Sequence, residues 1–180
     1  MLLLTIGKKI LFMSLIRIIR LIPNHIDEML SLQDIAHKNG DPFTPSSRAL
    51  YERAFMYQNF VFGAIDGSTN KLVGYCNCSI PTDKAKKNLG IGILPDNQLN
   101  AVGHVNTILV DSLYRRNGYG GELLEQVILT FKNNSTIHYI FTTLYTSNKP
   151  SYNLFIKYGF KDYMRIENSG VIKCLLLLSI

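Results

Sequence analysis

Residues 115–121 form a glycine-rich turn whose surroundings limit the folds open to this chain. The turn reads Arg-Arg-Asn-Gly-Tyr-Gly-Gly, follows a strand-like run at 104–110 and precedes a helix-like run at 122–131. A strand, a tight turn and a helix in this order point consecutive backbone N–H groups at one spot, which suits a phosphate or pyrophosphate. Gly118, Gly120 and Gly121 have no Cβ, so the backbone can come close to such a ligand. Arg115 and Arg116 add charged donors at the rim.

The spacing of the glycines excludes the two best-known phosphate loops. No glycine is followed by Lys-Ser or Lys-Thr at the P-loop offset, and the dinucleotide pattern G-x-G-x-x-G also fails. The remaining pattern is Arg-x-x-Gly-x-Gly, made by Arg115, Gly118 and Gly120. This segment resembles the acetyl-CoA pyrophosphate loop of the GNAT superfamily of N-acetyltransferases.

A second segment carries the same resemblance. The run from Asn148 to Leu154, followed by Lys157, Gly159 and Phe160, is similar to the N-x-x-A-x-x-L-Y-x-K-x-G-F segment of that superfamily. The two motifs stand about thirty residues apart, in the order of the superfamily, and together they are far more specific than either motif alone.

Composition limits the class of protein. The chain has 180 residues, 47% of them hydrophobic and 18% charged, which is typical of one globular domain. The formal net charge is +6, but the basic residues are scattered, which argues against a nucleic-acid partner. Three cysteines are too few for a disulfide framework or a four-ligand zinc site, so we expect buried free thiols, no metal and a cytoplasmic location.

The N-terminal 22 residues are apolar, yet lysines and arginines interrupt them, so no membrane span is predicted there. We interpret residues 1–13 as an extension and residues 14–180 as a single domain.

The periodicity of apolar residues and the turn signals predict the elements of that domain. The expected order is β-αα-βββ-α-β-α-ββ, an α/β (α+β) fold with a mixed, mostly antiparallel sheet flanked by helices, as in the superfamily. Strands are expected at 14–22, 60–65, 71–76, 104–110, 138–145, 160–164 and 171–180, and helices at 24–37, within 43–57, at 122–131 and from 148 to 159.

The resemblance implies which residues bind acetyl-CoA. Backbone groups of Ile108, Leu109 and Val110 are expected along the pantetheine arm, and Asn148 is expected to contact it or to cap a helix. Phe155 stands where relatives place a tyrosine beside the thioester sulfur. The N–H groups that would hold the pyrophosphate belong to Arg115, Arg116, Asn117, Gly118, Tyr119, Gly120 and Gly121.

The catalytic groups are less clearly marked. Many relatives carry a carboxylate base on the strand before the glycine turn, and residues 104–110 contain none. Two-residue alternation places His104, Asn106, Ile108 and Val110 on one face, so His104 is a candidate base and Asn106 a candidate for positioning water or substrate. His104 as a packed histidine is the alternative. With Phe155 in the tyrosine position, Tyr152 is the candidate acid, and Tyr158, solvent or a purely structural role for both tyrosines are the alternatives.

The resemblance implies transfer of an acetyl group from acetyl-CoA to a primary amine, by direct attack in a ternary complex. The acceptor is expected to be a small-molecule or peptide amine, with the connection at 81–103 beside it. The alternative is a CoA-binding sensor or scaffold that has lost catalysis, which Phe155 and the missing carboxylate favour. A homodimer is left open.

Overall fold

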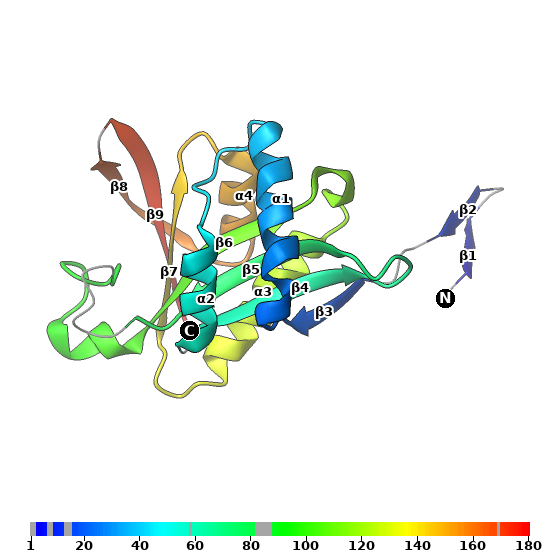
Figure 1. Cartoon of the computed structure of the whole chain (residues 1–180). Helices are drawn as coiled ribbons and strands as arrows, with labels where there is room; N and C mark the ends of the chain where they lie inside the picture. The colour runs from blue at the N-terminus through cyan, green and yellow to red at the C-terminus, as the bar shows by residue number, and fades with distance from the viewer. Residues whose placement is uncertain (1–2, 7–8, 13–15, 58, 82–87, 169) are drawn as a thin grey trace.

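A computed structural model describes residues 3–6, 9–12, 16–57, 59–81, 88–168 and 170–180. A seven-stranded sheet, in the order β3-β4-β5-β6-β7-β9-β8, forms the centre of the molecule (Figure 1). Every neighbouring pair is antiparallel except β6 and β7, which are parallel. The predicted fold class is therefore confirmed.

The helices and strands of this domain follow the predicted order. Their bounds are β3 (Ile16–Arg20), α1 (Ile26–Lys38), α2 (Arg48–Met56), β4 (Phe60–Asp66), β5 (Leu72–Ser79), β6 (Val102–Val110), α3 (Tyr119–Lys132), β7 (Tyr139–Tyr145), α4 (Lys149–Lys157), β8 (Lys161–Asn168) and β9 (Val171–Ser179), with short 3-10 helices at Pro23–His25, Asp96–Ala101 and Ser112–Tyr114.

The N-terminal extension contains a hairpin that the sequence analysis did not predict. Strands β1 (Leu3–Ile6) and β2 (Lys9–Phe12) pair antiparallel in a separate two-stranded sheet. Figure 1 shows this hairpin apart from the seven-stranded sheet.

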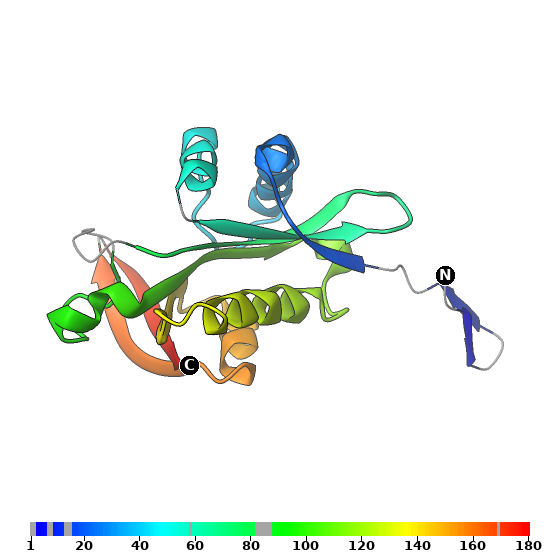
Figure 2. The same ribbon diagram turned by 90° about the horizontal axis from the view of Figure 1, so that it is seen from below.

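Helices cover both faces of the sheet. Helices α1 and α2 lie on one face and α3 and α4 on the other (Figure 2). We call these the α1/α2 face and the α3/α4 face. Helix α3 buries the stripe that its sequence predicts, with Leu123, Leu124, Val127 and Phe131 fully buried. Each such side chain stabilises the fold by about 1.5–3 kcal/mol through removal from water.

Helices α3 and α4, which flank the predicted site, have capping residues of types that are common at helix ends. Gly118, with a left-handed φ of 91°, is the N-cap of α3. Asn148 caps α4 by accepting a hydrogen bond from the Ser151 N–H at 3.1 Å, and Pro150 lies in the first turn. Gly159, with φ of 88°, follows the end of α4.

The turn between β4 and β5 is hydrogen-bonded to the connection between β6 and α3. Asp66 is buried, and its Oδ1 accepts hydrogen bonds from the N–H and hydroxyl of Ser68 at 2.8 and 2.6 Å. The Tyr114 hydroxyl donates to Asp66 Oδ2 at 2.9 Å. The carboxylate therefore orders its own turn and holds the segment that leads into the glycine turn.

Candidate active site

Strands β6 and β7 separate soon after they begin, and a cleft opens between them. Their parallel pairing covers only Val102 to His104 on β6. The Thr142 hydroxyl then donates to the Val105 carbonyl at 2.9 Å, and beyond it the pairing ends. The cleft has a volume of about 140 Å³. It is lined by Pro42, Phe43, Thr44, Val105, Asn106, Thr107, Ile108, Thr142, Thr143, Leu144, Tyr145, Asn148, Ser151, Phe155 and Lys173.

A β-bulge at Asn106 reshapes the β6 wall of the cleft. Val105 and Thr107 pair with Cys78 and Asn77 on β5, so Asn106 is the extra residue. The Asn106 side chain is exposed, and its amide nitrogen donates to the Ser79 hydroxyl at 3.0 Å. A bulge leaves its extra residue out of the ladder, and Asn106 is one of the residues that line the cleft.

The bulge corrects the expected alternation along β6. Val105 packs in the same core cluster as Ile108 and Val110, three and five residues further on. Without the bulge, His104 rather than Val105 would share a face with Ile108. The predicted common face is therefore confirmed for Ile108 and Val110 and wrong for His104, while Asn106 is the bulge residue.

The glycine turn has the geometry expected of an anion site. Arg116 and Gly118 have left-handed φ values of 65° and 91°, so the backbone curls before α3 begins at Tyr119. The N–H groups in the first turn of a helix have no intrahelical partner and carry the positive end of the helix dipole. A Cβ placed on Gly120 would meet only Leu154 at 3.5 Å and Val110 at 3.8 Å. The backbone of the turn is therefore open at Gly120, as the predicted anion site requires.

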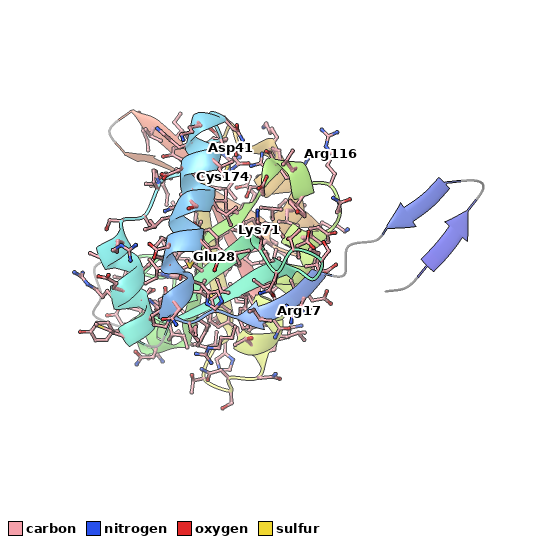
Figure 3. All side chains as sticks on the ribbon, turned by 45° about the vertical axis from the view of Figure 1, so that its right-hand side comes forward. Arg17, Glu28, Asp41, Lys71, Arg116 and Cys174 are labelled. Atoms are coloured by element: carbon pink, nitrogen blue, oxygen red, sulfur yellow. The ribbon has the colours of Figure 1, made fainter. Side chains whose placement is uncertain are left out.

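The side chain of Arg115 does not extend to the rim, where the sequence analysis placed it. Its Nε donates to the Val110 carbonyl at 2.9 Å, and its guanidinium forms two hydrogen bonds with the Asp41 carboxylate. This pair joins the glycine turn to the segment after α1, and the Asp41 hydrogen bond raises the pKa of Arg115. Arg116 remains exposed and extends outward from the loop (Figure 3).

His104 is not one of the described residues that line the cleft. The residue is 5% exposed, and its Nε2 accepts a hydrogen bond from the Leu89 backbone N–H at 3.1 Å. Burial lowers the pKa of His104 to about 4. Its Nε2 lone pair is engaged in holding residues 88–90 against β6, so accepting a proton there would break that bond.

The two candidate acids, Tyr152 and Tyr158, are also not among the described residues that line the cleft. The Tyr152 hydroxyl donates to Asp162 Oδ2 at 3.1 Å, which raises the pKa of Tyr152. Tyr158 lies against the start of α3, where a Cβ on Gly121 would be 2.5 Å from its hydroxyl. Phe155 does line the cleft and is 2% exposed. The structure thus brings Asn106, Ile108, Asn148 and Phe155 together, and not His104 or Tyr152.

Several residues of the cleft were missed from the sequence. Pro42 to Thr44 come from the α1–α2 connection, Thr142 to Tyr145 from β7 and Lys173 from β9. The Tyr145 and Thr44 hydroxyls are 2.9 Å apart, which joins two of these segments. They carry no shared motif, and only the tertiary structure brings them together.

Asn148 has two contacts that can be separated by mutation. Its Oδ1 caps α4, and its Nδ2 donates to the Pro42 carbonyl at 3.1 Å. We expect Asn148→Ala to lower the free energy of unfolding by about 1–2 kcal/mol, since the cap is lost. Asn148→Asp keeps an acceptor for Ser151 and should lose less stability, although it no longer donates to Pro42. Urea unfolding of both variants tests this, and equal losses would show that the cap contributes little.

Among the described residues, no cluster of three or more His, Cys, Asp or Glu side chains could hold a metal ion. The three cysteines are buried free thiols. No helix within the described ranges is long and apolar enough to cross a membrane.

Comparison with solved structures reveals many proteins of the same fold. The chain is similar to the ribosomal-protein-S18-alanine N-acetyltransferase from Escherichia coli, with a TM-score of 0.72 and 16% identity over 92% of this chain and 94% of that chain. It is also similar to Arabidopsis thaliana NAA60 in complex with acetyl-CoA, with a TM-score of 0.74 and 14% identity over 92% and 99% of the two chains. An N-acetyltransferase from Staphylococcus aureus Mu50 gives a TM-score of 0.72 and 17% identity over 92% and 99%. Identities this low establish the fold alone.

No curated protein matches the chain significantly in sequence. A family model described as the acetyltransferase (GNAT) family, however, matches residues 26–160. That match includes the glycine turn, the separated strands and the capped helix α4, and it spans well over half of the chain. The protein therefore belongs to the GNAT family of acetyltransferases.

Proposed function

We propose that this protein is an acetyl-CoA-dependent N-acetyltransferase that acts on a primary amine by direct attack in a ternary complex. The observation that carries the proposal is the separation of β6 and β7 next to the glycine turn. It leaves a cleft through the sheet with an anion site at one end.

The residues of this chain fit the parts of acetyl-CoA. Past His104, the side of β6 that faces β7 has no strand paired with it, so its backbone groups can bind the amides of a pantetheine arm as a partner strand would. Ile108, Leu109 and Val110 would line that arm, with Asn148 and Phe155 beside it. The pyrophosphate would bind the N–H groups from Arg115 to Gly121.

Acetyl-CoA supplies an activated thioester, so the protein has mainly to place the amine and polarise the carbonyl. In the reaction the amine nitrogen bonds to the thioester carbonyl carbon, the C–S bond breaks with its electron pair on sulfur, and the amine proton passes to water. Backbone groups at the Asn106 bulge could stabilise the carbonyl oxygen, and the Asn106 side chain could position the amine or a water.

The contacts of His104, the candidate base, and of Tyr152, the candidate acid, support positioning roles for both residues. The contact with Leu89 supports a positioning role for His104, which fixes the segment next to β6. The contact with Asp162 similarly supports a positioning role for Tyr152. Proton transfer through either residue remains a hypothesis, and solvent can accept the amine proton and protonate the thiolate.

Two measurements test the proposal. Calorimetric titration with acetyl-CoA, with ATP as a control, should show saturable binding of acetyl-CoA alone. Thiol release should then accelerate when a suitable amine is added. Binding without amine-dependent thiol release would instead support the CoA-binding sensor, and no binding by the folded protein would overturn both.

A further inference from the structure

The residues that line the cleft come from elements on both faces of the sheet. Phe155 and Ser151 line it from α4, on the α3/α4 face, next to the glycine turn. Pro42, Phe43 and Thr44 line it from the α1–α2 connection, on the α1/α2 face. With the cofactor bound beside α3, the acceptor would approach from the α1/α2 face, and we call the part of the cleft lined by Pro42, Phe43, Thr44, Tyr145 and Lys173 the acceptor opening.

Lys173 lies at the acceptor opening. It stands directly opposite Tyr145 in the β7–β9 register, so the two side chains share a face of the sheet. The Tyr145 hydroxyl contacts Thr44, and the Lys173 ammonium lies 4.7 Å from the centroid of the Tyr145 ring. The next residue, Cys174, packs in the core cluster with α3, as alternation along β9 requires.

The acceptor opening carries a positive charge with no negative partner among the described residues. Lys173 is the charged member of the described lining, whose remaining polar groups are hydroxyls and amides. No ion pair within the described ranges involves Lys173. Glu167 on β8 pairs with Ile172, and it therefore points to the face opposite Lys173.

The wall that faces Lys173 is held in place. The buried Gln33 side chain donates to the Ser46 carbonyl at 3.0 Å and accepts from the Ser46 N–H at 2.8 Å. The Asn148–Pro42 hydrogen bond and the Asp41–Arg115 pair fix the other end of the same connection. The α1–α2 connection is therefore held at both ends, and it places the Thr44 hydroxyl beside Tyr145 and the Lys173 ammonium.

We propose that the acceptor amine carries a carboxylate and that Lys173 binds it, an inference that rests on the proposed acetyltransferase function. A charge-assisted hydrogen bond to a carboxylate gives the unpaired ammonium a partner. The same charge disfavours the ammonium form of the acceptor, which helps to provide the neutral nucleophile without a carboxylate base. A polycationic acceptor, such as a polyamine, would meet repulsion and no anionic ligand in the described lining.

Matched acceptors test this inference in the wild-type protein. In the first arm, thiol release with L-alanine and L-glutamate is compared with thiol release with their α-amides. In the second arm, peptides that begin Ala-Glu are compared with peptides that begin Ala-Gln, all of them amidated at the C-terminus. We expect the carboxylate of at least one pair to raise kcat/KM about ten- to a hundredfold. The first arm identifies free amino acids and the second identifies acidic peptide N-termini.

A substitution of Lys173 tests whether this residue causes the preference for carboxylated acceptors. Lys173→Gln should reduce the preference for the carboxylate to near one, because kcat/KM falls about ten- to a hundredfold further with the acid than with the amide. The dissociation constant for acetyl-CoA, measured by calorimetry, should stay at the wild-type value. Lys161→Gln removes an exposed lysine of β8 outside the cleft and should keep the wild-type preference.

The outcomes separate this inference from the proposed function. Acetyl-CoA binding together with equal use of acids and amides, a preference for spermidine, or no turnover of any carboxylated amine would overturn the inference alone. A carboxylate preference that survives in Lys173→Gln would also overturn it. Failure of the folded protein to bind acetyl-CoA would remove both proposals.

Discussion

Gly120→Val is expected to weaken acetyl-CoA binding at least about a hundredfold, which corresponds to about 2.8 kcal/mol. The isopropyl group would occupy the space in which a pyrophosphate approaches the N–H groups at the start of α3. The fold should tolerate it better than the ligand does, because φ at Gly120 is not left-handed and the nearest atoms to a Cβ are ordinary contacts at 3.5 and 3.8 Å. Calorimetric titration with acetyl-CoA measures the loss.

Two controls separate the loss of binding from damage to α3. Gly120→Ala adds a single methyl group and should give an intermediate affinity. Leu129→Val places the same β-branched side chain on the exposed face of the same helix and should bind acetyl-CoA normally. Gly121 cannot serve as a control, since a Cβ there would lie 2.5 Å from the Tyr158 hydroxyl. Wild-type affinity in a folded Gly120→Val protein would show that the pyrophosphate binds elsewhere.

Local sequence patterns were enough to predict the elements that form the cofactor side of the cleft. The glycine turn, the apolar stripe of α3 and the Asn148 cap each depend on residues within a few positions of one another. Such features are set by backbone geometry and helix periodicity, which a single sequence displays directly. The predicted order of strands and helices followed from the same signals.

Contacts between distant segments could not be predicted in this way. Arg115 looked like a free donor, yet Asp41, seventy-four positions away, binds its guanidinium. His104 could be predicted only as a candidate base or a packed histidine, and the Leu89 N–H that binds its ring comes from a connection that carried no regular pattern. The bulge at Asn106 gives no local signal either, because it depends on the register of β6 against β5. In each case a contact with a distant segment changes what the side chain can do, although the residue type alone had suggested a functional role.

His104 makes the stability of the fold depend on pH. Burial lowers its pKa from 6.5 to about 4, because the charged ring loses its hydration. Between these two values the unfolded chain binds a proton that the folded chain does not bind. The contribution of the neutral ring to stability is therefore fully present above pH 6.5 and is lost as the pH falls toward 4.

We expect this single group to lower the free energy of unfolding by about 2 kcal/mol between pH 7.5 and pH 5. His104→Gln should remove that part of the pH dependence, since glutamine stays neutral and its oxygen can still accept the Leu89 N–H. The variant is expected to be less stable than wild type at pH 7.5 through imperfect packing, and closer to it at pH 5. Urea unfolding at both pH values measures the difference, with His138→Gln, which removes an exposed histidine, as the matched control. Parallel losses in wild type and His104→Gln would show that the ring is protonated as readily in the fold as in the unfolded chain, and that His104 is accessible enough to act as the base after all.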